Sequence, residues 1–240
     1  MANTIKNNIP NAVTCLNLAS GCVGVVFAFK GQFDVVAICM VASGIFDLLD
    51  GLIARALGVS SAIGRELDSL ADVVSFGFLP GAIYFMLLSQ FQIQSPHTLY
   101  AWLPYAGFIV TIFSAIRLAK FNLDERQQSD FIGLNTPMNA FYVLSLPYII
   151  AQSTLIPRMG EILGHPIFLL VSIGITSWLL VSEFRLFSLK LNSLSWQDNK
   201  YKYLFLLVSA GLLLVLQLTA VPLILILYFG FSFLHFKVAR

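Results

Sequence analysis

Long apolar stretches separated by short polar ones follow one another along the whole chain. A helix needs about 20 largely apolar residues to cross the hydrocarbon core of a bilayer. Eight stretches approach or exceed that length, so we predict an all-α, polytopic transmembrane helical bundle. The predicted spans cover residues 12–30, 33–57, 66–90, 99–121, 138–156, 165–187, 201–218 and 220–237.

The composition supports a membrane protein. Of the 240 residues, 58% are hydrophobic and 11% are charged, with a mean hydropathy of +0.84, whereas soluble domains carry about 25% charged residues. We predict a single integral membrane catalytic domain over residues 1–240. A net charge of +2 gives no reason to expect nucleic acid as a partner.

The distribution of positive charge predicts an orientation. Eight spans place both termini on one side of the membrane. If that side is the cytoplasm, 12 of the 14 Lys and Arg residues lie inside, as the positive-inside rule requires. We therefore predict a multi-pass protein of the cell (cytoplasmic) membrane with both termini cytoplasmic and membrane lipids around it.

Four aspartates interrupt the apolar pattern of the second and third predicted spans. Asp47 and Asp50 are three residues apart, and Asp68 and Asp72 are four apart, so each pair shares one helix face. Left bare at mid-bilayer, four carboxylates would cost on the order of 10 kcal/mol. A short loop at 58–63 lets the two faces meet, and a pair of divalent cations, Mg²⁺ or Mn²⁺, would compensate the charge.

Small and basic residues accompany these acids. Gly51 and Gly64 have no Cβ and leave room for a ligand, and Arg55 could bind a phosphate or pair with an aspartate. Metals, a cation and space for a bulky anion are the parts of a phosphoryl-transfer site. The spacing alone leaves a metal or proton-coupled transporter open, as well as a role in helix packing.

The complete pattern is Asp-x2-Asp-Gly-x2-Ala-Arg-x8-Gly-x3-Asp-x3-Asp, and in it the chain resembles the CDP-alcohol phosphotransferase family. The resemblance implies the CDP-alcohol phosphotransferase fold, with a cytoplasm-facing polar cavity and a homodimeric assembly. A six-helix core would cover residues 12–187, and the spans at 201–237 would be additional. The matching residues are Asp47, Asp50, Gly51, Ala54, Arg55, Gly64, Asp68 and Asp72.

The same resemblance implies a role for each matching residue. Asp47, Asp50 and Asp68 would hold the metal ions. Asp72 would be the general base that accepts the proton of the acceptor hydroxyl, whose high pKa requires one, and it could also contact a metal. Gly51, Ala54, Arg55 and Gly64 would line the CDP pocket.

Further segments narrow the acceptor. Residues 9–21, 71–77, 117–122 and 131–137 resemble the compact, membrane-integral phosphatidylserine synthases. This implies that CDP-diacylglycerol and L-serine give phosphatidylserine and CMP. Asn135 stands where these synthases commonly have a proline. Glycerol 3-phosphate or inositol phosphate as acceptor, and an archaeal ether lipid as donor, remain alternatives within the same reaction class.

Two polar residues of the first span are candidates for binding the CDP-lipid. Thr14 and Asn17 are three residues apart, so both could reach the cytidine or its ribose. Polar residues in transmembrane helices also hold helices together, which is the alternative interpretation.

Cations and amides near the fourth span are candidates for binding serine or phosphate. Arg117 and Lys120 are three residues apart at its cytoplasmic end, and either could bind a carboxylate or the diphosphate. Asn122 and Asn135 could hydrogen-bond the ammonium or carboxylate of serine. The alternative is that Arg117 and Lys120 are anchors that extend to lipid headgroups.

Overall fold

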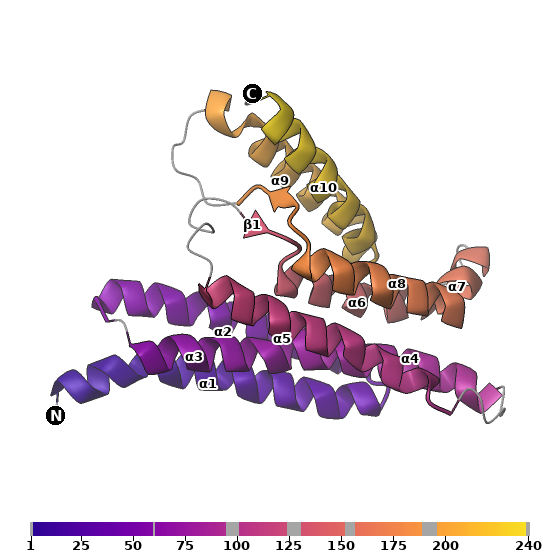
Figure 1. Ribbon diagram of the computed structural model, residues 1–240, viewed down its shortest axis with the longest axis horizontal. Helices are drawn as coiled ribbons and strands as arrows, with labels where there is room; N and C mark the ends of the chain where they lie inside the picture. The colour runs from indigo at the N-terminus through magenta and orange to yellow at the C-terminus, as the bar shows by residue number, and fades with distance from the viewer. Residues whose placement is uncertain are drawn as a thin grey trace.

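A computed structural model describes residues 2–59, 61–94, 101–123, 131–151, 157–188 and 196–238 of the chain. Helices dominate these residues (Figure 1). In chain order the elements are α1 (Ala2–Phe29), α2 (Phe33–Leu57), α3 (Ala62–Asp72), the π-helix η1 (Val73–Phe78), α4 (Leu79–Gln94), the 3₁₀ helix η3 (Leu103–Gly107), α5 (Phe108–Leu123), β1 (Phe131–Ile132), α6 (Thr136–Ala151), α7 (Pro157–Gly164), α8 (Pro166–Val181), β2 (Arg185–Leu186), α9 (Trp196–Leu216), the 3₁₀ helix η4 (Gln217–Ala220) and α10 (Val221–Val238).

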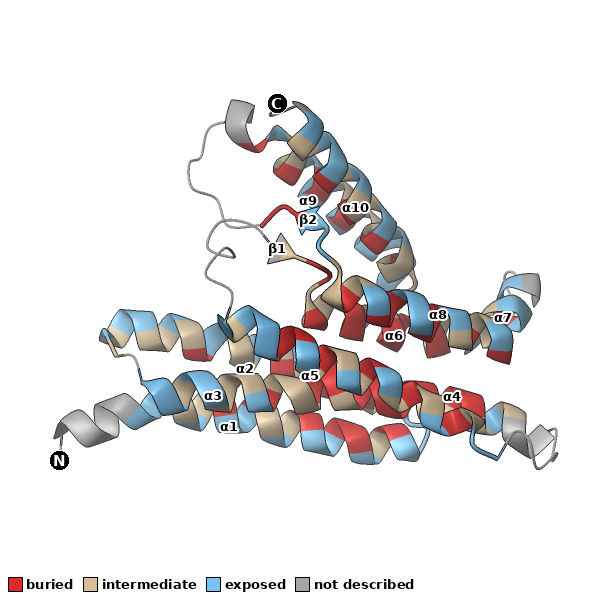
Figure 2. Cartoon of the chain, viewed as in Figure 1, coloured by how far each residue is buried: buried red, intermediate tan, exposed pale blue. Residues whose placement is uncertain are grey.

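The helices form a bundle and a separate hairpin. Helices α1 to α5 lie alongside one another, α6 and α8 lie on one side of them, and α9 and α10 form a hairpin tilted away from the bundle (Figure 1). Buried residues concentrate in α4, α5, α6 and α8, whereas much of α1, α2, α9 and α10 is exposed (Figure 2). Exposed apolar surface on long helices suits a protein whose outer solvent is lipid.

The structure confirms the all-α membrane fold but not the number of spans. Five stretches of the described residues are long and apolar enough to cross a membrane, and four of them coincide with the first four predicted spans. The fifth, Asn199–Lys237, covers most of α9 and α10 and includes both of the last two predicted spans, 201–218 and 220–237. Helices α6 and α8 have 16 residues each. The count of eight therefore stays a prediction.

The predicted span at 165–187 is too long at its C-terminal end, because α8 ends at Val181. Ser182 is extended, and Arg185–Leu186 then pairs antiparallel with Phe131–Ile132. This two-residue strand pair holds the segment before α6 against the end of α8. Backbone pairing between segments more than 50 residues apart is a tertiary event that local hydropathy does not signal.

Gly133 completes this connection. Its φ is +75°, and its N–H donates to the carbonyl of Phe184 at 2.8 Å. A Cβ at Gly133 would lie 2.8 Å from the carbonyl oxygen of Ser182 and 2.9 Å from that of Leu180. Only glycine therefore fits both the left-handed backbone and the close approach, and the start of α6 is fixed in place.

The helices that carry the aspartates meet α1 at a close contact. Ser43 of α2 and Ser75 of η1 both donate to the carbonyl oxygen of Asn17, at 3.2 and 3.1 Å. A Cβ at Gly21 would collide with Ser75. The π-helix η1 follows Asp72 directly, and π-turns of this kind are frequent at functional sites. The contact sets the positions of α1, α2 and α3 relative to one another.

Candidate active site

Three aspartates from two helices converge at one end of the bundle. Asp47 and Asp50 of α2 and Asp68 of α3 each offer a carboxylate oxygen, and these oxygens lie within 4.8 Å of one another. A tight turn makes this possible: Gly58 ends α2 at φ +64°, and Ser61 caps α3 by accepting from the N–H of Gly64 at 2.9 Å. The convergence expected from the spacing is therefore observed.

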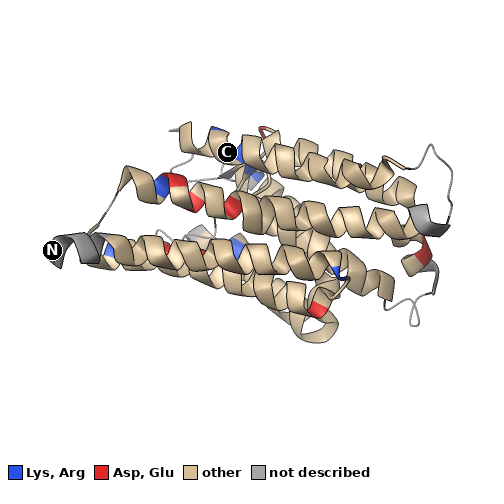
Figure 3. Cartoon of the chain, turned by 90° about the horizontal axis from the view of Figure 1, so that it is seen from below, with Lys and Arg blue, Asp and Glu red and all other residues tan. Residues whose placement is uncertain are grey.

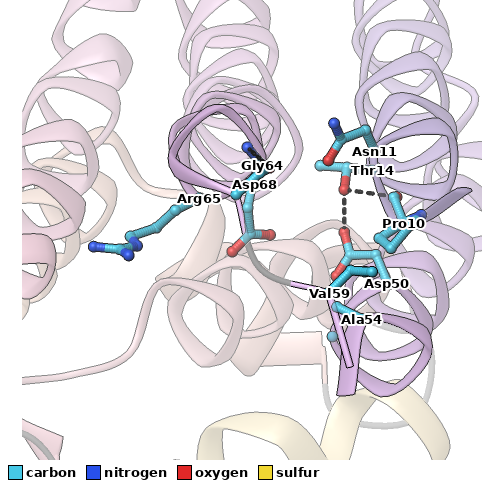
Figure 4. Close-up of a pocket in the computed structure, with 11 residues that line it drawn as sticks. Pro10, Asn11, Thr14, Asp50, Ala54, Val59, Gly64, Arg65 and Asp68 are labelled. Carbon is cyan, nitrogen blue, oxygen red and sulfur yellow. Dashed lines mark hydrogen bonds between the residues drawn. The ribbon is translucent and has the colours of Figure 1, made fainter. Parts of the chain in front are cut away.

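Asp50 is the most enclosed of these acids, with 7% of its surface exposed. The hydroxyl of Thr14 lies 2.6 Å from its Oδ2 and 3.1 Å from the carbonyl oxygen of Pro10 (Figure 4). Thr14, which is itself buried, thus contacts the acidic cluster directly. Its position suits orientation of Asp50 at least as well as contact with a nucleotide.

Asp72 is not one of the three carboxylates that lie within 4.8 Å of one another, although it interacts electrostatically with Asp47, Asp68 and Asp50. It is one helical turn beyond Asp68, and the Nδ2 of Asn17 donates to its Oδ1 at 3.3 Å. Asn17 is fully buried, and its own Oδ1 has no hydrogen-bond partner among the described residues. The structure thus brings together three of the four predicted metal ligands and gives the fourth a separate partner.

The acidic cluster fits a divalent metal ion. Its donors are all carboxylate oxygens, the ligands that Mg²⁺ and Mn²⁺ prefer. The oxygens of Asp47 and Asp68 lie within 4.8 Å of each other, and Asp68 Oδ1 is buried without a partner in the described part of the chain. A cation would satisfy that oxygen and offset the repulsion between the acids.

A pocket opens beside the cluster (Figure 4). Gly51, Ala54 and Gly64 line it, as expected of the residues assigned to the CDP pocket. A Cβ at Gly64 would lie 2.9 Å from both Asn11 Oδ1 and Ser61 Oγ, so glycine permits the close approach of α1 to α3. The full lining is Pro10, Asn11, Thr14, Asp50, Gly51, Ala54, Val59, Ser61, Gly64, Arg65 and Asp68.

The sequence prediction missed several of these lining residues, among them Asn11, Ser61 and Arg65. Asn11 lies one turn before Thr14 on α1, and Arg65 follows Gly64 directly, so helical periodicity and adjacency to the motif were the available signals. In Figure 4, Arg65 extends away from the carboxylates of Asp50 and Asp68.

Arg55 does not line the pocket in this arrangement. It is exposed, and its Nη2 lies 3.8 Å from the position that a Cβ of Gly51 would take. The guanidinium therefore stays on the face of α2 that carries Gly51. Charged residues gather mainly toward the end of the bundle that holds the N-terminus (Figure 3).

Arg117 and Lys120 have different environments. Arg117 is buried, with 7% of its surface exposed, and its Nη1 donates to Thr136 Oγ1 at 3.1 Å. Its guanidinium lies over the ring of Phe121 and interacts electrostatically with Asp72. Lys120 is exposed. A buried guanidinium does not reach lipid headgroups, so the anchor interpretation fits Lys120 and not Arg117.

The two asparagines assigned to the acceptor have structural partners. Asn122 Nδ2 donates to Ser69 Oγ at 2.9 Å and so joins α5 to α3 beside Asp68. Asn135 Oδ1 accepts from the N–H of Met138 at 2.9 Å, which makes Asn135 the N-cap of α6. Asparagine is among the best N-cap residues, and this accounts for its presence at a position where a proline was expected.

Comparison with known proteins identifies the family. The sequence model of the CDP-alcohol phosphatidyltransferases matches residues 7–234. The chain belongs to the CDP-alcohol phosphatidyltransferase family. It is therefore a multi-pass membrane protein, in agreement with its apolar helices.

Individual relatives extend this result. Over 146 residues the chain is 34% identical to a CDP-diacylglycerol–serine O-phosphatidyltransferase of Mycobacterium leprae, covering 58% of this chain and 46% of the relative. A protein of the same name from Helicobacter pylori is 36% identical over 137 residues, or 56% of this chain and 55% of the relative. An archaetidylserine synthase of Methanothermobacter thermautotrophicus is 27% identical over 139 residues, with coverage of 57% and 56%. The chain thus spans about half the length of the curated relatives that it matches.

Proposed function

We propose that this protein transfers the phosphatidyl group of CDP-diacylglycerol to the hydroxyl of L-serine, giving phosphatidylserine and CMP. The observation that carries the proposal is the junction of the acidic cluster with the pocket, since Asp50 and Asp68 belong to both. The names of the relatives support serine as the acceptor.

The reaction gives three of the four acids one task and the fourth another. Asp47, Asp50 and Asp68 would hold Mg²⁺ or Mn²⁺ and, through the metal, the diphosphate. When bound, two such ions stabilise the attacking and leaving oxygens of a phosphoryl displacement. Thr14 keeps Asp50 in position through its hydroxyl, and Gly51, Ala54 and Gly64 leave space for the CDP group.

Asp72 would accept the proton of the serine hydroxyl. Asn17 holds one of its oxygens by a hydrogen bond, and a base fixed in this way is ready for proton transfer. The serine oxygen then bonds to the phosphorus attached to diacylglycerol, the bond from that phosphorus to the CMP oxygen breaks, and CMP leaves with the electron pair. Because Asp72 lies outside the three-carboxylate cluster, the base role suits it better than that of a metal ligand.

Arg117 is the best candidate for holding the carboxylate of serine. It is buried, it interacts electrostatically with Asp72, and Thr136 fixes its guanidinium. Arg55 and Lys120 are exposed and would attract anionic substrates at the surface. Asn122 and Asn135 would support the site through α3 and α6 rather than touch serine.

An acceptor screen tests the proposal. Purified protein in detergent with CDP-diacylglycerol and Mg²⁺ should release CMP when L-serine is added and stop when EDTA removes the metal. Release of CMP with glycerol 3-phosphate but not with serine would overturn the assignment of serine as the acceptor.

The archaetidylserine synthase among the relatives gives a specific reason to include an ether-lipid donor in the screen. Family membership favours a transferase over the transporter alternative.

We also propose the assembly and location of the enzyme. It would lie in the cytoplasmic membrane as a homodimer with both termini in the cytoplasm, so that CDP, serine and metal reach the acids from water. The catalytic core would be residues 12–187, with α9 and α10 as an added hairpin. Mass measurement in lipid nanodiscs would test the dimer.

A further inference from the structure

Asn139 is a buried polar residue that packing does not explain. It lies on α6, its exposed fraction is 0%, and neither Nδ2 nor Oδ1 has a hydrogen-bond partner among the described residues. Buried amides in proteins nearly always have partners, because an unpaired one loses its bonds to water and gains nothing in return. A side chain with two such atoms indicates that a partner is supplied from outside the chain.

A second unpartnered group lies on the same side of α6. Arg117 bonds to Thr136 through Nη1, but its Nε is buried without a partner in the described residues. Thr136 and Asn139 are three residues apart and share a helix face. The carboxamide of Asn139 therefore lies one turn along α6 from the residue that holds Arg117.

The depth of Asn139 relative to the acids follows from the register of α6 and α2. At the far end of the pair, Tyr148 Oη donates to the carbonyl oxygen of Phe33 at 3.0 Å. Because the end of α6 meets the start of α2 and the two helices pack together, they run antiparallel, and both rise about 1.5 Å per residue. The residue nine positions before Tyr148 is Asn139, and it thus lies level with the residue nine positions after Phe33, which is Ala42. Ala42 directly precedes Ser43, whose hydroxyl donates to the carbonyl oxygen of Asn17, the partner of Asp72.

We propose that Asn139 and Arg117 form the binding site for an amino-acid acceptor. The Arg117 guanidinium, with its free Nε, binds the carboxylate, and Oδ1 of Asn139 accepts a hydrogen bond from the ammonium group. The acceptor hydroxyl then faces Asp72, with which Arg117 already interacts. This assignment rests on the proposed serine transfer. It adds the two contacts by which the enzyme would select an acceptor that carries both an ammonium and a carboxylate group over a simple alcohol.

Asn139→Ala provides the first test. In the full-length protein, the KM for serine should rise at least tenfold, while the KM for CDP-diacylglycerol stays within twofold of the wild-type value. Ser177→Ala is the matched control, because Ser177 of α8 is also buried with an unpartnered hydroxyl and should change neither constant. An unchanged serine KM for Asn139→Ala, or an equal rise in both constants, would overturn the inference.

Two analogues of serine separate the two contacts. 3-Hydroxypropionate lacks the ammonium group, and ethanolamine lacks the carboxylate. As inhibitors of serine transfer, 3-hydroxypropionate should bind equally well to Asn139→Ala and wild type, and ethanolamine equally well to Arg117→Ala and wild type. If Asn139→Ala weakens 3-hydroxypropionate as much as serine, Asn139 does not bind the ammonium.

Stability distinguishes this role from a structural one. Removing an unpartnered buried amide should leave the thermal unfolding midpoint of Asn139→Ala at or above that of the wild type, and a marked fall would overturn the inference. Failure of the proposed function would look different from failure of this inference. If the proposed function is wrong, the wild-type protein itself shows no serine-dependent release of CMP.

Discussion

At the scale of single residues, α1 organises the acidic site from the outside. Its Thr14 bonds to Asp50 and its Asn17 bonds to Asp72, so one helix face orients one acid from each pair. Groups that orient metal ligands in this way typically change metal affinity by 10–100-fold when they are removed. Both residues were predicted to contact the CDP-lipid. Their hydrogen bonds to Asp50 and Asp72 indicate that they also orient the acids.

Thr14→Val keeps the shape of the side chain and removes its hydroxyl. We expect the Mg²⁺ concentration for half-maximal CMP release to rise about tenfold, because Asp50 loses the hydroxyl that donates to its Oδ2. Thr176→Val is the control, since Thr176 bonds within α8 to the carbonyl of Ser172. CMP release is measured against Mg²⁺ concentration for both variants. If their titration curves are superimposable, Thr14 does not support the metal site.

Asp72→Asn removes the proposed base with almost no change in shape. We expect CMP release to fall by about 10²–10⁴-fold, the usual contribution of general base catalysis, while the affinity for CDP-diacylglycerol is retained because the three clustered acids remain. Asp34→Asn, at the opposite end of α2 and exposed, should keep wild-type activity. A near-normal rate for Asp72→Asn would refute the base assignment.

At the scale of elements, the sequence could predict the features that depend on local helical periodicity, but not those that depend on tertiary packing. The meeting of Asp47, Asp50 and Asp68 was predictable because helical spacing fixes a face and a short loop forces two helices to be antiparallel. The π-helix η1 and the unpaired amide of Asn139 were not, because each depends on how distant helices pack. The cap at Asn135 was visible only once α6 had a defined start.

Gly133→Ala tests the connection between β1 and α6. The left-handed φ and the nearby carbonyl oxygens of Ser182 and Leu180 should make this change cost about 1–3 kcal/mol of folding free energy. Displacement of Thr136 should also raise the serine KM through Arg117. Gly174→Ala in α8 meets no atom within 4 Å and should be neutral or stabilising by up to about 1 kcal/mol. Thermal unfolding in detergent compares the two; equal midpoints would contradict the constraint at Gly133.

At the scale of the whole molecule, the two 16-residue helices decide the topology. Helices α6 and α8 would each be about 24 Å long, shorter than the roughly 30 Å hydrocarbon core of a bilayer. Helix α9 and helix α10 are separated by η4, where Gln217 has a φ of +52°, so this stretch of 39 residues holds two helices packed side by side rather than one. Each helix that crosses the membrane reverses the side on which the chain ends.

The location of the two termini therefore tests whether the span count is even, as a count of eight requires. If α6, α8, α9 and α10 all cross, the count is eight and both termini are cytoplasmic, as the positive-inside rule also requires. Epitope tags at the two ends should then both resist protease added to right-side-out vesicles and both be digested in inverted ones. If only one tag is digested in each preparation, the count is odd and one or three of these four helices fail to cross. The acids should remain cytoplasmic even then, because they lie on the hairpin between the second and third spans, upstream of every helix whose crossing is in question. Such a result would change the topology of the C-terminal half without moving the proposed active site.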